Sequence, residues 1–321
     1  MPLISHDIQV SIVIPSYNYG HLIKDTLDNL LLQDYCHWEA IIVDDGSSDN
    51  TKGIVNEFCE KDSRFIYVYK ENGGLASARN LGILLARGTY VQFLDADDYL
   101  SQNKINAQVA YMNANPTCSI SYTDAKYFAH DNPASLFNNL DLNFANWMPK
   151  SSGHGSSLIG GFIQENLFPV NSALVRLSFI KENRIEFKTA MKYLEDWDFW
   201  IRCCLSNALF QYISDVDAYA MIRVHSASMS KNRFQMVHYE LDLMESLESE
   251  IYSRNINKPE LFKLIKKKRE KVFRRVLRIR GYTNLGVIKE IIAKLGFFGL
   301  MRVYIKELNY IRKKQQFSIE E

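Results

Sequence analysis

Three carboxylates follow one short apolar segment of the chain. Residues 90–94 (YVQFL) have the composition of a buried parallel strand, and Asp95, Asp97 and Asp98 come directly after it. Carboxylates this close together repel one another and lose hydration at the edge of a sheet. A divalent cation with oxygen ligands, shared with a phosphate-bearing substrate, would offset both effects. The alternative is a polar turn that caps the following helix, because Asp is a good N-cap residue.

A second acidic group lies about a hundred residues farther on, in residues 194–202 (LEDWDFWIR). A carboxylate at a helix start beside large aromatic rings is partly desolvated, which raises its pKa toward the range of a general base. The carboxylates of this segment are Glu195, Asp196 and Asp198, and the faces of Trp197 and Trp200 could cover the apolar side of a sugar ring. The alternative is a capped amphipathic helix whose aromatic residues belong to the core.

Two histidines lie in segments rich in small polar residues. His225 follows an expected strand and stands in RVHSASMS, where a neutral imidazole could bind a metal and a protonated one could pair with phosphate. His154 stands in SSGHGSS, within an irregular stretch over residues 130–164. Such a stretch is typical of a lid, a binding loop or an inserted segment. For His154, a solvated loop position is the simpler interpretation.

Alternating strands and helices are expected to position these side chains. The apolar pattern predicts strands at 9–15, 38–43, 65–69 and 90–94, and helices at 21–32, 50–59 and 75–86. This order gives a parallel sheet with helices on both faces, and ligands collect at the carboxyl ends of its strands. The polar turns after strands one, two and four should therefore lie along one edge of the sheet: residues 16–18, 44–47 and 95–98.

The absence of two common glycine-rich phosphate-binding motifs narrows the choice of enzyme class. The chain has no GxxxxGK[ST], and no GxGxxG follows its first strand, so the P-loop and dinucleotide-oxidoreductase interpretations lose support. Residues 72–82 (NGGLASARNLG) instead place two glycines at a helix start and Arg79 about two turns into that helix. Backbone N–H groups and a guanidinium suit a phosphate or a nucleotide, and the alternative is a surface arginine.

Four blocks in order carry a resemblance to a known family. They are PSYN at 15–18, VDDGSSDNT at 43–51, NGGLASARN at 72–80 and RGTYVQFLDADD at 87–98. Together they resemble family 2 glycosyltransferases of the GT-A fold. The resemblance implies a Rossmann-like α/β domain with a mainly parallel central sheet, a nucleoside-diphosphate-sugar donor, and Mn²⁺ or Mg²⁺. It covers about the first hundred residues.

The resemblance also implies roles for individual residues. Asp95 would approach the ribose, and Asp97, the last Asp of a DXD motif, would hold the metal with His225. Asp196 would deprotonate the acceptor hydroxyl with Glu195 in support, and Glu195 as the base is the alternative. The residues implied to bind the nucleotide sugar are Pro15, Tyr17, Asn18, Asp44, Asp45, Gly74, Arg79, Asp95 and Ala96. Asp98 is left to start the next helix.

Charge is distributed unevenly over the 321 residues, although the net charge is only +1. From Leu261 onward there are 17 Lys and Arg against 5 Glu, within a sequence that reads as helical from residue 232. Basic amphipathic helices of this type lie on anionic membranes, so we expect peripheral membrane contact through 261–316. Packing on the catalytic domain and a homo-oligomer contact are the alternatives. Nucleic acid fits less well, because no recognition fold accompanies the charge.

Bulk features suggest the compartment and the domains. Five cysteines without CxxC spacing indicate free buried thiols in a reducing compartment, and neither a signal peptide nor a transmembrane-length apolar run is evident. We therefore expect a protein at the cytosolic face of a membrane. The expected domains are a GT-A catalytic domain over 1–231, with a nucleotide-binding half at about 1–100 and an acceptor-side half at 101–231, and a helical extension over 232–321.

The interpretation that unites these features is an inverting, metal-dependent glycosyltransferase. It would move a sugar from a nucleoside-diphosphate donor, with a UDP-sugar favoured, to a hydroxyl on a glycan or lipid-linked glycan. One alternative is a nucleotidyltransferase that makes nucleotide sugars, although such enzymes carry an Arg- or Lys-containing Gly-rich loop that PSYNYG does not resemble. The other is a non-catalytic GT-A-like scaffold.

Overall fold

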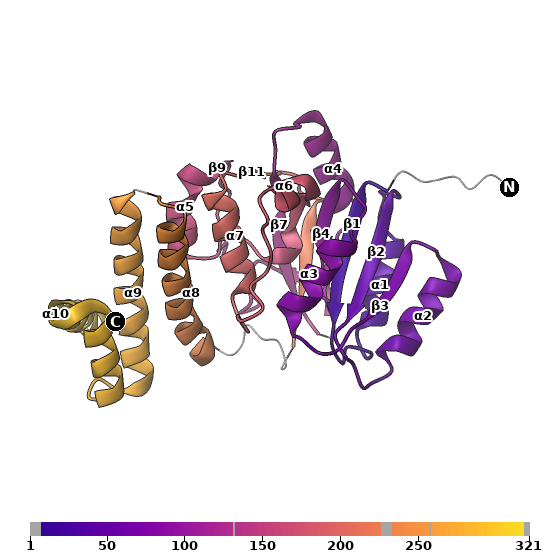
Figure 1. Ribbon diagram of the computed structural model, residues 1–321. Coiled ribbons are helices and arrows are strands. Elements are labelled where there is room, and N and C mark those ends of the chain that lie inside the picture. Colours follow the sequence, from indigo (N-terminus) through magenta and orange to yellow (C-terminus); the bar gives the residue numbers. More distant parts are fainter. Residues whose placement is uncertain (1–7, 131, 226–232, 257, 318–321) are drawn as a thin grey trace. The chain divides into compact units, whose positions relative to one another are not determined.

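The computed structural model describes residues 8–130, 132–225, 233–256 and 258–317. These residues form two compact units, Met1–Phe162 with Asn166–Ser228, and Met229–Glu321 with Ile163–Glu165 (Figure 1). The predicted domain boundary at 231–232 lies outside the described residues. We describe each unit by itself.

The first unit is built on an eight-stranded mixed sheet with the order β3-β2-β1-β4-β10-β6-β11-β9. Strands β3, β2, β1 and β4 run parallel, as predicted, and β10 is antiparallel to both of its neighbours, β4 and β6. The strand bounds are β1 Val10–Ser16, β2 Trp38–Asp44, β3 Phe65–Tyr69, β4 Tyr90–Phe93, β6 Ile120–Tyr122, β9 Gly153–His154, β10 Ala173–Arg176 and β11 Leu209–Tyr212.

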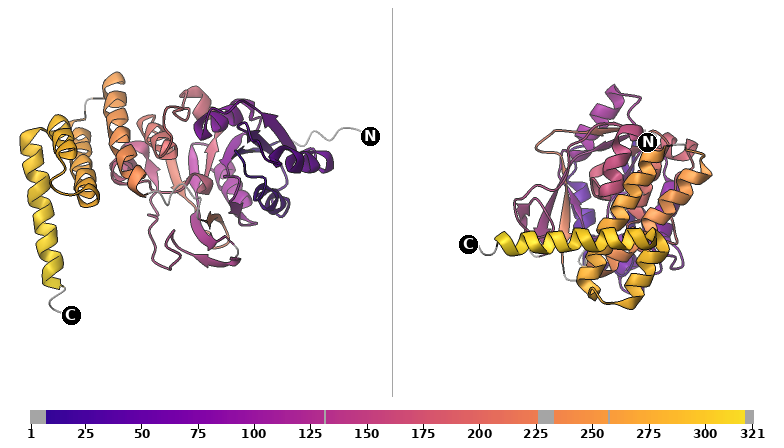
Figure 2. Two further views of the ribbon diagram at one scale, coloured as in Figure 1. Left: turned by 90° about the horizontal axis from the view of Figure 1, so that it is seen from below. Right: turned by 90° about the vertical axis from the view of Figure 1, so that its left-hand side faces the viewer.

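Helices cover both faces of this sheet (Figures 1 and 2). Strand β1 shows why: Val10, Ile12 and Ile14 face one apolar core, while Val13 on the opposite face meets Gly82 of α3. A strand that is apolar on both faces is stable only between two layers of helices. The helices of the unit are α1 Ile23–Leu31, α2 Thr51–Lys61, α3 Leu75–Leu85, α4 Lys104–Ala114, α5 Gly155–Gln164, α6 Leu177–Glu182 and α7 Glu195–Leu205.

A second, four-stranded sheet has the order β5-β12-β7-β8. Its central strand, β12 (Tyr219–Val224), pairs in parallel with β7 (Asp124–Ala129) and antiparallel with β5 (Tyr99–Leu100). Because β5 directly follows the aspartate turn and His225 directly follows β12, this pairing brings two distant parts of the candidate site together.

Two predictions of local structure need correction. Asp98 does not begin a helix, because β5 comes next and α4 begins only at Lys104. Residues 130–164 are more regular than expected: they include β8 (Asn132–Phe137), β9 and α5, and His154 is exposed on β9. None of the five cysteines forms a disulfide; Cys118, Cys203 and Cys204 are buried as predicted, whereas Cys36 is exposed.

The second unit consists of α8 Arg233–Ser253, α9 Pro259–Arg280 and α10 Leu285–Phe317, which bends at Gly296. Its small core includes Val272, Phe273 and Val303. Several basic side chains are held by glutamates of the same unit; Arg302 and Lys306, for example, both contact Glu270. Among the described residues, no helix has the length and hydropathy to cross a bilayer.

Candidate active site

Direct hydrogen bonds join the turn after β1 to the turn after β2, at the edge of the sheet where the parallel strands end. The backbone N–H of Asn18 donates to Oγ of Ser47 (2.9 Å), and Oδ1 of Asn18 accepts from the backbone N–H of Ser48 (2.8 Å). Asn18 has a left-handed φ of 57°, a conformation that Asn tolerates better than most residues. The predicted shared edge is therefore confirmed for these turns.

Asp45 is engaged by the segment that begins α3. Its two carboxylate oxygens accept the backbone N–H groups of Gly73 (2.9 Å) and Gly74 (2.7 Å), and Nζ of Lys70 lies 2.5 Å away. The two glycine N–H groups that the sequence suggested for a phosphate are thus satisfied by a side chain of the protein. The positive φ of Gly74 (86°) explains why glycine stands at this turn.

Other predicted nucleotide residues differ widely in exposure. Tyr17 is 50% exposed, whereas Ala96 is 3% exposed. Pro15 is buried within β1. Asp44 is 1% exposed and accepts from the hydroxyl of Tyr67 (2.6 Å) and the backbone N–H of Ser47 (2.8 Å). Asp44 therefore shapes the turn from beneath, and Tyr17 has the most accessible side chain of this group.

The three carboxylates of the aspartate turn have separate environments. Asp98 is buried, where Oδ1 accepts the backbone N–H of Arg223 (2.7 Å) and Oδ2 accepts from the side-chain amide of Asn171. Burial and the charges of Asp97 and Asp95 hold the pKa of Asp98 well above its usual value. Asp98 thus anchors the turn, while Asp95 keeps 34% of its side chain exposed.

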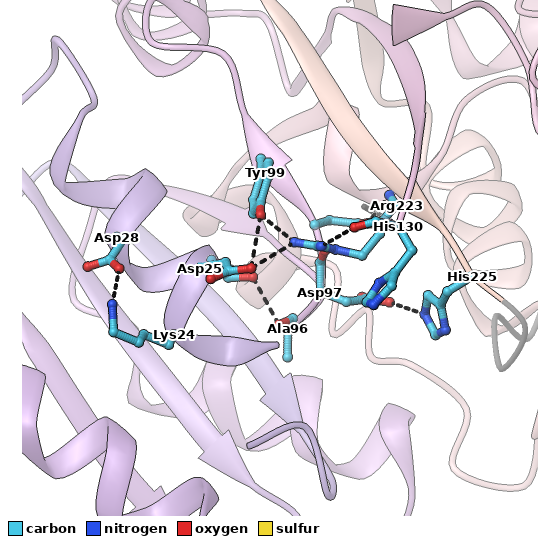
Figure 3. A network of polar contacts seen from close by, with 11 residues as sticks. Lys24, Asp25, Asp28, Ala96, Asp97, Tyr99, His130, Arg223 and His225 are labelled. Carbon is cyan, nitrogen blue, oxygen red and sulfur yellow. Dashed lines mark hydrogen bonds and ion pairs between the residues drawn. The ribbon is translucent and has the colours of Figure 1, made fainter. Parts of the chain in front are cut away.

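Asp97 faces His225 across the edge of the sheet, with Oδ2 of Asp97 2.8 Å from Nε2 of His225 (Figure 3). Burial and the charge of Asp95 raise the pKa of Asp97, and the contact with His225 lowers it. Arg223 secures the pair: its Nε donates to the carbonyl of Asp97 (2.8 Å) and its Nη1 to the carbonyl of His130 (2.9 Å). The guanidinium also lies over the Tyr99 ring, 4.9 Å from the centroid.

The Asp97–His225 pair fits a divalent cation by its chemistry. A carboxylate oxygen and an imidazole nitrogen are both ligands that Mn²⁺ accepts, and the two side chains keep 13% and 11% of their surface exposed. Among the described residues, no group of three or more His, Cys, Asp or Glu side chains could hold a metal. If Asp97 and His225 held a cation, oxygens of a substrate or of water would have to supply its other ligands.

The acidic pair Glu195–Asp196 begins α7 after a strained residue. Leu194 has a left-handed φ of 61°, which is unfavourable for a bulky side chain and turns the chain sharply into the helix. Oδ2 of Asp196 accepts from the side-chain amide of Asn166 (2.9 Å). Burial and the neighbouring charge of Glu195 raise the pKa of Asp196 to about 7, against the opposing effect of Arg79. A carboxylate with that pKa is suited to general-base chemistry at neutral pH.

Arg79 connects the two acidic groups. Its guanidinium is 2% exposed, with Nη1 2.6 Å from Oε1 of Glu195 and Nη2 2.7 Å from Oδ1 of Asp95. The sequence placed Arg79 against the nucleotide, and that contact stays a prediction. In the structure, both ends of the guanidinium are occupied by carboxylates of the protein.

The aromatic residues of α7 belong to the core. Trp200 is fully buried and packs on Phe168, with ring centroids 5.1 Å apart. Trp197 is 4% exposed, and its indole N–H donates to the carbonyl of Phe162. Neither ring presents a face to a ligand, so we correct the predicted sugar contacts of Trp197 and Trp200: their size and apolarity serve packing.

Sequence reasoning missed several residues that build this site. Tyr19 lies near the aspartate turn, where burial and the charges of Asp97, Asp95 and Asp98 raise its pKa. The ring of His130 lies beside that of His225, with centroids 6.2 Å apart. Tertiary pairing, rather than any local signal, places these side chains. The other missed residues are Asn166 and Asn171, which hydrogen-bond to Asp196 and Asp98. Arg223 was a weaker candidate from the sequence, because it stands beside His225 in RVHSASMS.

The sequence of the chain matches the profile described as "Glycosyl transferase family 2" over residues 11–155. This segment contains the four sequence blocks, the aspartate turn and Arg79. This segment of the chain belongs to glycosyltransferase family 2.

Relatives of this family member include proteins of bacterial polysaccharide synthesis. The putative teichuronic acid biosynthesis glycosyltransferase TuaG of Bacillus subtilis is 42% identical over 123 residues, which make up 38% of this chain and 48% of TuaG. An uncharacterized glycosyltransferase of Rickettsia bellii is 34% identical over 175 residues, 52% of this chain and 25% of that protein. The chain thus spans less than half the length of these two curated relatives.

A longer alignment relates this family 2 chain to WfgD of Escherichia coli, a UDP-Glc:α-D-GlcNAc-diphosphoundecaprenol β-1,3-glucosyltransferase. The two are 28% identical over 246 residues, which cover 74% of this chain and 86% of WfgD.

Solved structures show the same GT-A-like fold. Residues 1–349 of S. aureus TarS in complex with UDP-GlcNAc superpose with a TM-score of 0.65 at 20% identity, covering 83% of this chain and 72% of that one. The mannosyltransferase PcManGT from Pyrobaculum calidifontis, in complex with GDP-Man and Mn²⁺, gives a TM-score of 0.55 at 16% identity, covering 94% and 87%. The predicted fold class, a mainly parallel α/β sheet followed by C-terminal helices, is confirmed.

Proposed function

We propose that this chain is an inverting glycosyltransferase that moves a sugar from a UDP-sugar to a hydroxyl of a lipid-linked glycan. One observation carries the proposal: two acidic sites of different character meet at one edge of the sheet. Asp95 and Asp97 lie on the turn after β4, and the Glu195–Asp196 pair begins α7. Arg79 contacts both groups, so donor-side and base-side carboxylates are neighbours.

The donor side suits a nucleoside diphosphate. Tyr17 offers an exposed ring for the base, and the partly exposed Asp95 can accept hydrogen bonds from ribose hydroxyls. Asp97 and His225 would hold Mn²⁺ or Mg²⁺. When bound, such a cation supplies positive charge that stabilises the negative charge developing on the leaving diphosphate. Pro15, Asn18, Asp44, Asp45, Gly74 and Ala96 are proposed to shape this pocket chiefly through the backbone and turn geometry.

The acceptor side suits proton removal. Asp196, with a pKa raised to about 7, takes the proton of the acceptor hydroxyl. At the same time, the oxygen of that hydroxyl forms a bond to the anomeric carbon of the donor sugar. The bond from that carbon to the diphosphate oxygen breaks in the same displacement, which inverts the anomeric centre. Asn166 orients the Asp196 carboxylate through its 2.9 Å hydrogen bond.

The lipid-linked acceptor is proposed from the WfgD relationship and from the second unit. Residues 261–316 were predicted to contact an anionic membrane, and the structure offers a specific face of α10 for it. On the part after Gly296, five large apolar side chains are exposed along one stripe: Phe297 (63%), Phe298 (81%), Met301 (48%), Ile305 (52%) and Leu308 (52%). Their spacing places them on one helical face, the pattern of a helix that lies in a membrane interface.

The test is donor-dependent transfer by the purified chain. UDP-glucose, UDP-GlcNAc, UDP-galactose and GDP-mannose are each incubated with GlcNAc-diphosphoundecaprenol, with Mn²⁺, Mg²⁺ or EDTA. We expect one UDP-sugar to give UDP and an extended glycan, with the opposite anomeric configuration to the donor, and EDTA to abolish transfer. A thermal-shift screen of the same nucleotides identifies the donor independently, because a ligand that binds the native state raises its melting temperature.

The alternatives predict different products. A nucleotidyltransferase releases pyrophosphate from sugar phosphate and a nucleoside triphosphate, and a scaffold neither hydrolyses nor transfers any donor. Either outcome would contradict the proposal. The raised pKa of Asp196 supports transfer, because a carboxylate with a pKa of about 7 suits removal of the proton from an acceptor hydroxyl.

A further inference from the structure

Arg79 has an unusual environment for a residue expected to bind a nucleotide. It lies on α3, fully within the first unit, and only 2% of its side chain is exposed. Its two terminal nitrogens contact Asp95, 16 residues away, and Glu195, 116 residues away. The plane of the guanidinium lies near the Phe187 ring, with 5.2 Å between Cζ and the centroid. A planar group held between two carboxylates and a ring has a single orientation.

The charge of Arg79 acts on three carboxylates at once. Asp95 and Glu195 are in direct contact with it, and it also lowers the pKa of Asp196, which Glu195 raises. The charged groups that act on Asp196 are thus Glu195 from its own helix and Arg79 from α3, while Asn166 contributes a neutral hydrogen bond. Removing a buried cation leaves its carboxylate partners unpaired, so the effect of Arg79 must reach both sites.

We propose that Arg79 is a positioning residue that couples the donor site to the catalytic acidic pair. It holds Asp95 in place for the donor, and it fixes Glu195 so that Asp196 remains the carboxylate available to the acceptor. This inference rests on the proposed function. Lysine cannot replace arginine here, because one ammonium group cannot span two carboxylates that approach from opposite ends of the guanidinium.

The experiment compares four variants in a glycosyl-transfer assay: R79K, R79M, E195Q and the double variant R79M/E195Q. R79K should keep the fold but weaken both donor binding and turnover by about 10- to 100-fold, the range for residues that orient a primary ligand. E195Q removes a negative neighbour of Asp196, so the acidic limb of the rate profile should move to lower pH. Adding R79M to E195Q removes the positive neighbour and should move that limb back to higher pH.

A matched control separates this role from a purely structural one. R202M breaks another buried contact between arginine and a carboxylate, since Nε of Arg202 lies 2.7 Å from Oδ2 of Asp198. It should lower the melting temperature without moving the acidic limb or the donor affinity. If R79K binds the donor as wild type does, or if E195Q and R79M/E195Q share one acidic limb, Arg79 acts only on stability and the inference is wrong.

A donor-free measurement keeps the inference testable apart from the proposed function. The pH dependence of the free energy of unfolding is measured for E195Q and R79M/E195Q, each with Asp196 and with D196N. The difference between the Asp196 and D196N proteins reports where Asp196 titrates. The titration should lie at higher pH when Arg79 is absent, and equal midpoints would refute the coupling. Loss of transfer with every donor would instead overturn the proposed function and leave this result intact.

Discussion

Oδ2 of Asp97 lies 2.8 Å from Nε2 of His225, although 128 residues separate them. The pairing of β5 with β12 produces this contact, because Asp97 precedes β5 and His225 follows β12. Arg223 then ties the carbonyl of Asp97 to the same strand. Strand pairing therefore holds Asp97 and His225 in place, which would favour precise placement of a cation between them.

The first prediction concerns this pair. H225A should weaken Mn²⁺ binding in the presence of UDP by at least about 10-fold, because one of two protein ligands is lost. D97N should lower the transfer rate by about 10² to 10³, the effect of removing one electrostatic contact to the transition state. Titration calorimetry of Mn²⁺ into the protein with UDP measures the first effect. H154A, at an exposed position on β9, is the control and should bind Mn²⁺ normally. Unchanged affinity in H225A would remove His225 from the site.

The second prediction concerns the base. D196N should reduce transfer by about 10² to 10⁴, the usual contribution of general-base catalysis, while donor affinity stays near that of wild type. In wild type, the rate should rise with pH through about 7, because the deprotonated form of Asp196 is the active one. If E195Q loses the activity and D196N keeps it, the two roles are exchanged.

Stability should show the opposite trend at the same residue. The folded-state pKa of Asp196 is raised from 3.8 to about 7, so the native state binds more protons than the unfolded state between these values. The free energy of unfolding contributed by Asp196 therefore falls as pH rises through this window. D196N should melt at a higher temperature than wild type at pH 8, by about 2–4 °C for each kcal/mol. An equal or lower melting temperature would mean that ionisation of Asp196 does not lower the free energy of unfolding.

The third prediction concerns Lys104, which is fully buried at the start of α4. Its Nζ donates to the side-chain oxygens of Gln92 (2.6 Å) and Gln108 (2.7 Å), and burial lowers its pKa well below 10.5. Above the lowered pKa and up to about 10.5, the unfolded state binds a proton that the native state lacks, so stability rises with pH. K104M should lose this slope. Urea titrations at pH 7.5, 8.5 and 9.5 measure it, and equal slopes in both proteins would show a charged Lys104.

The fourth prediction concerns the packing of α3 on β1. A Cβ atom on Gly82 would lie 2.2 Å from Cγ1 of Val13, so G82A should cost about 1–3 kcal/mol and lower the melting temperature. G161A is the matched control, because its Cβ would meet only Leu167 at 3.4 Å or more. Inside α5, that change should instead stabilise by roughly 0.5–1 kcal/mol. Similar melting temperatures for both variants would show that α3 can shift away from β1.

The fifth prediction concerns the exposed stripe on α10. The triple variant F298S/M301S/I305S should bind phosphatidylglycerol vesicles more than about 10-fold more weakly than wild type. The reason is that three large apolar side chains can no longer be buried in the membrane interface. L285S, at a site that is 71% exposed outside the stripe, is the control. Sedimentation with vesicles of phosphatidylglycerol and of phosphatidylcholine measures both. Equal sedimentation of the triple variant and wild type would exclude the stripe as the membrane contact.

The sequence predicted the parallel part of the fold well because local patterns determine it. Strands such as β3 carry continuous apolar runs, and the polar turns after β1, β2 and β4 mark one edge by topology alone. Roles that depend on tertiary contacts were less accessible. Asp98 looked like a helix cap, but its partners Asn171 and Arg223 lie 73 and 125 residues away.

The basic tail illustrates the same limit. Its composition predicted basic amphipathic helices in contact with an anionic membrane, but Arg302 and Lys306 share the carboxylate of Glu270. Arg278 lies 2.5 Å from Glu307, so acidic residues spaced along the helices neutralise part of the charge. Only the three-dimensional structure shows which basic side chains form ion pairs and which apolar side chains remain exposed.

Strand β10 also has a consequence for synthesis of the protein. It lies between β4 and β6 in the sheet, although it is encoded some eighty residues after β4. A nascent chain that has not yet released Arg176 from the ribosome therefore carries β4 with one edge unpaired. The matched family segment, residues 11–155, ends before this strand. Residues 11–155 alone therefore lack the strand that pairs with the second edge of β4. If translation stalled before β10 was made, the nascent chain would expose this edge, and another chain could pair with it.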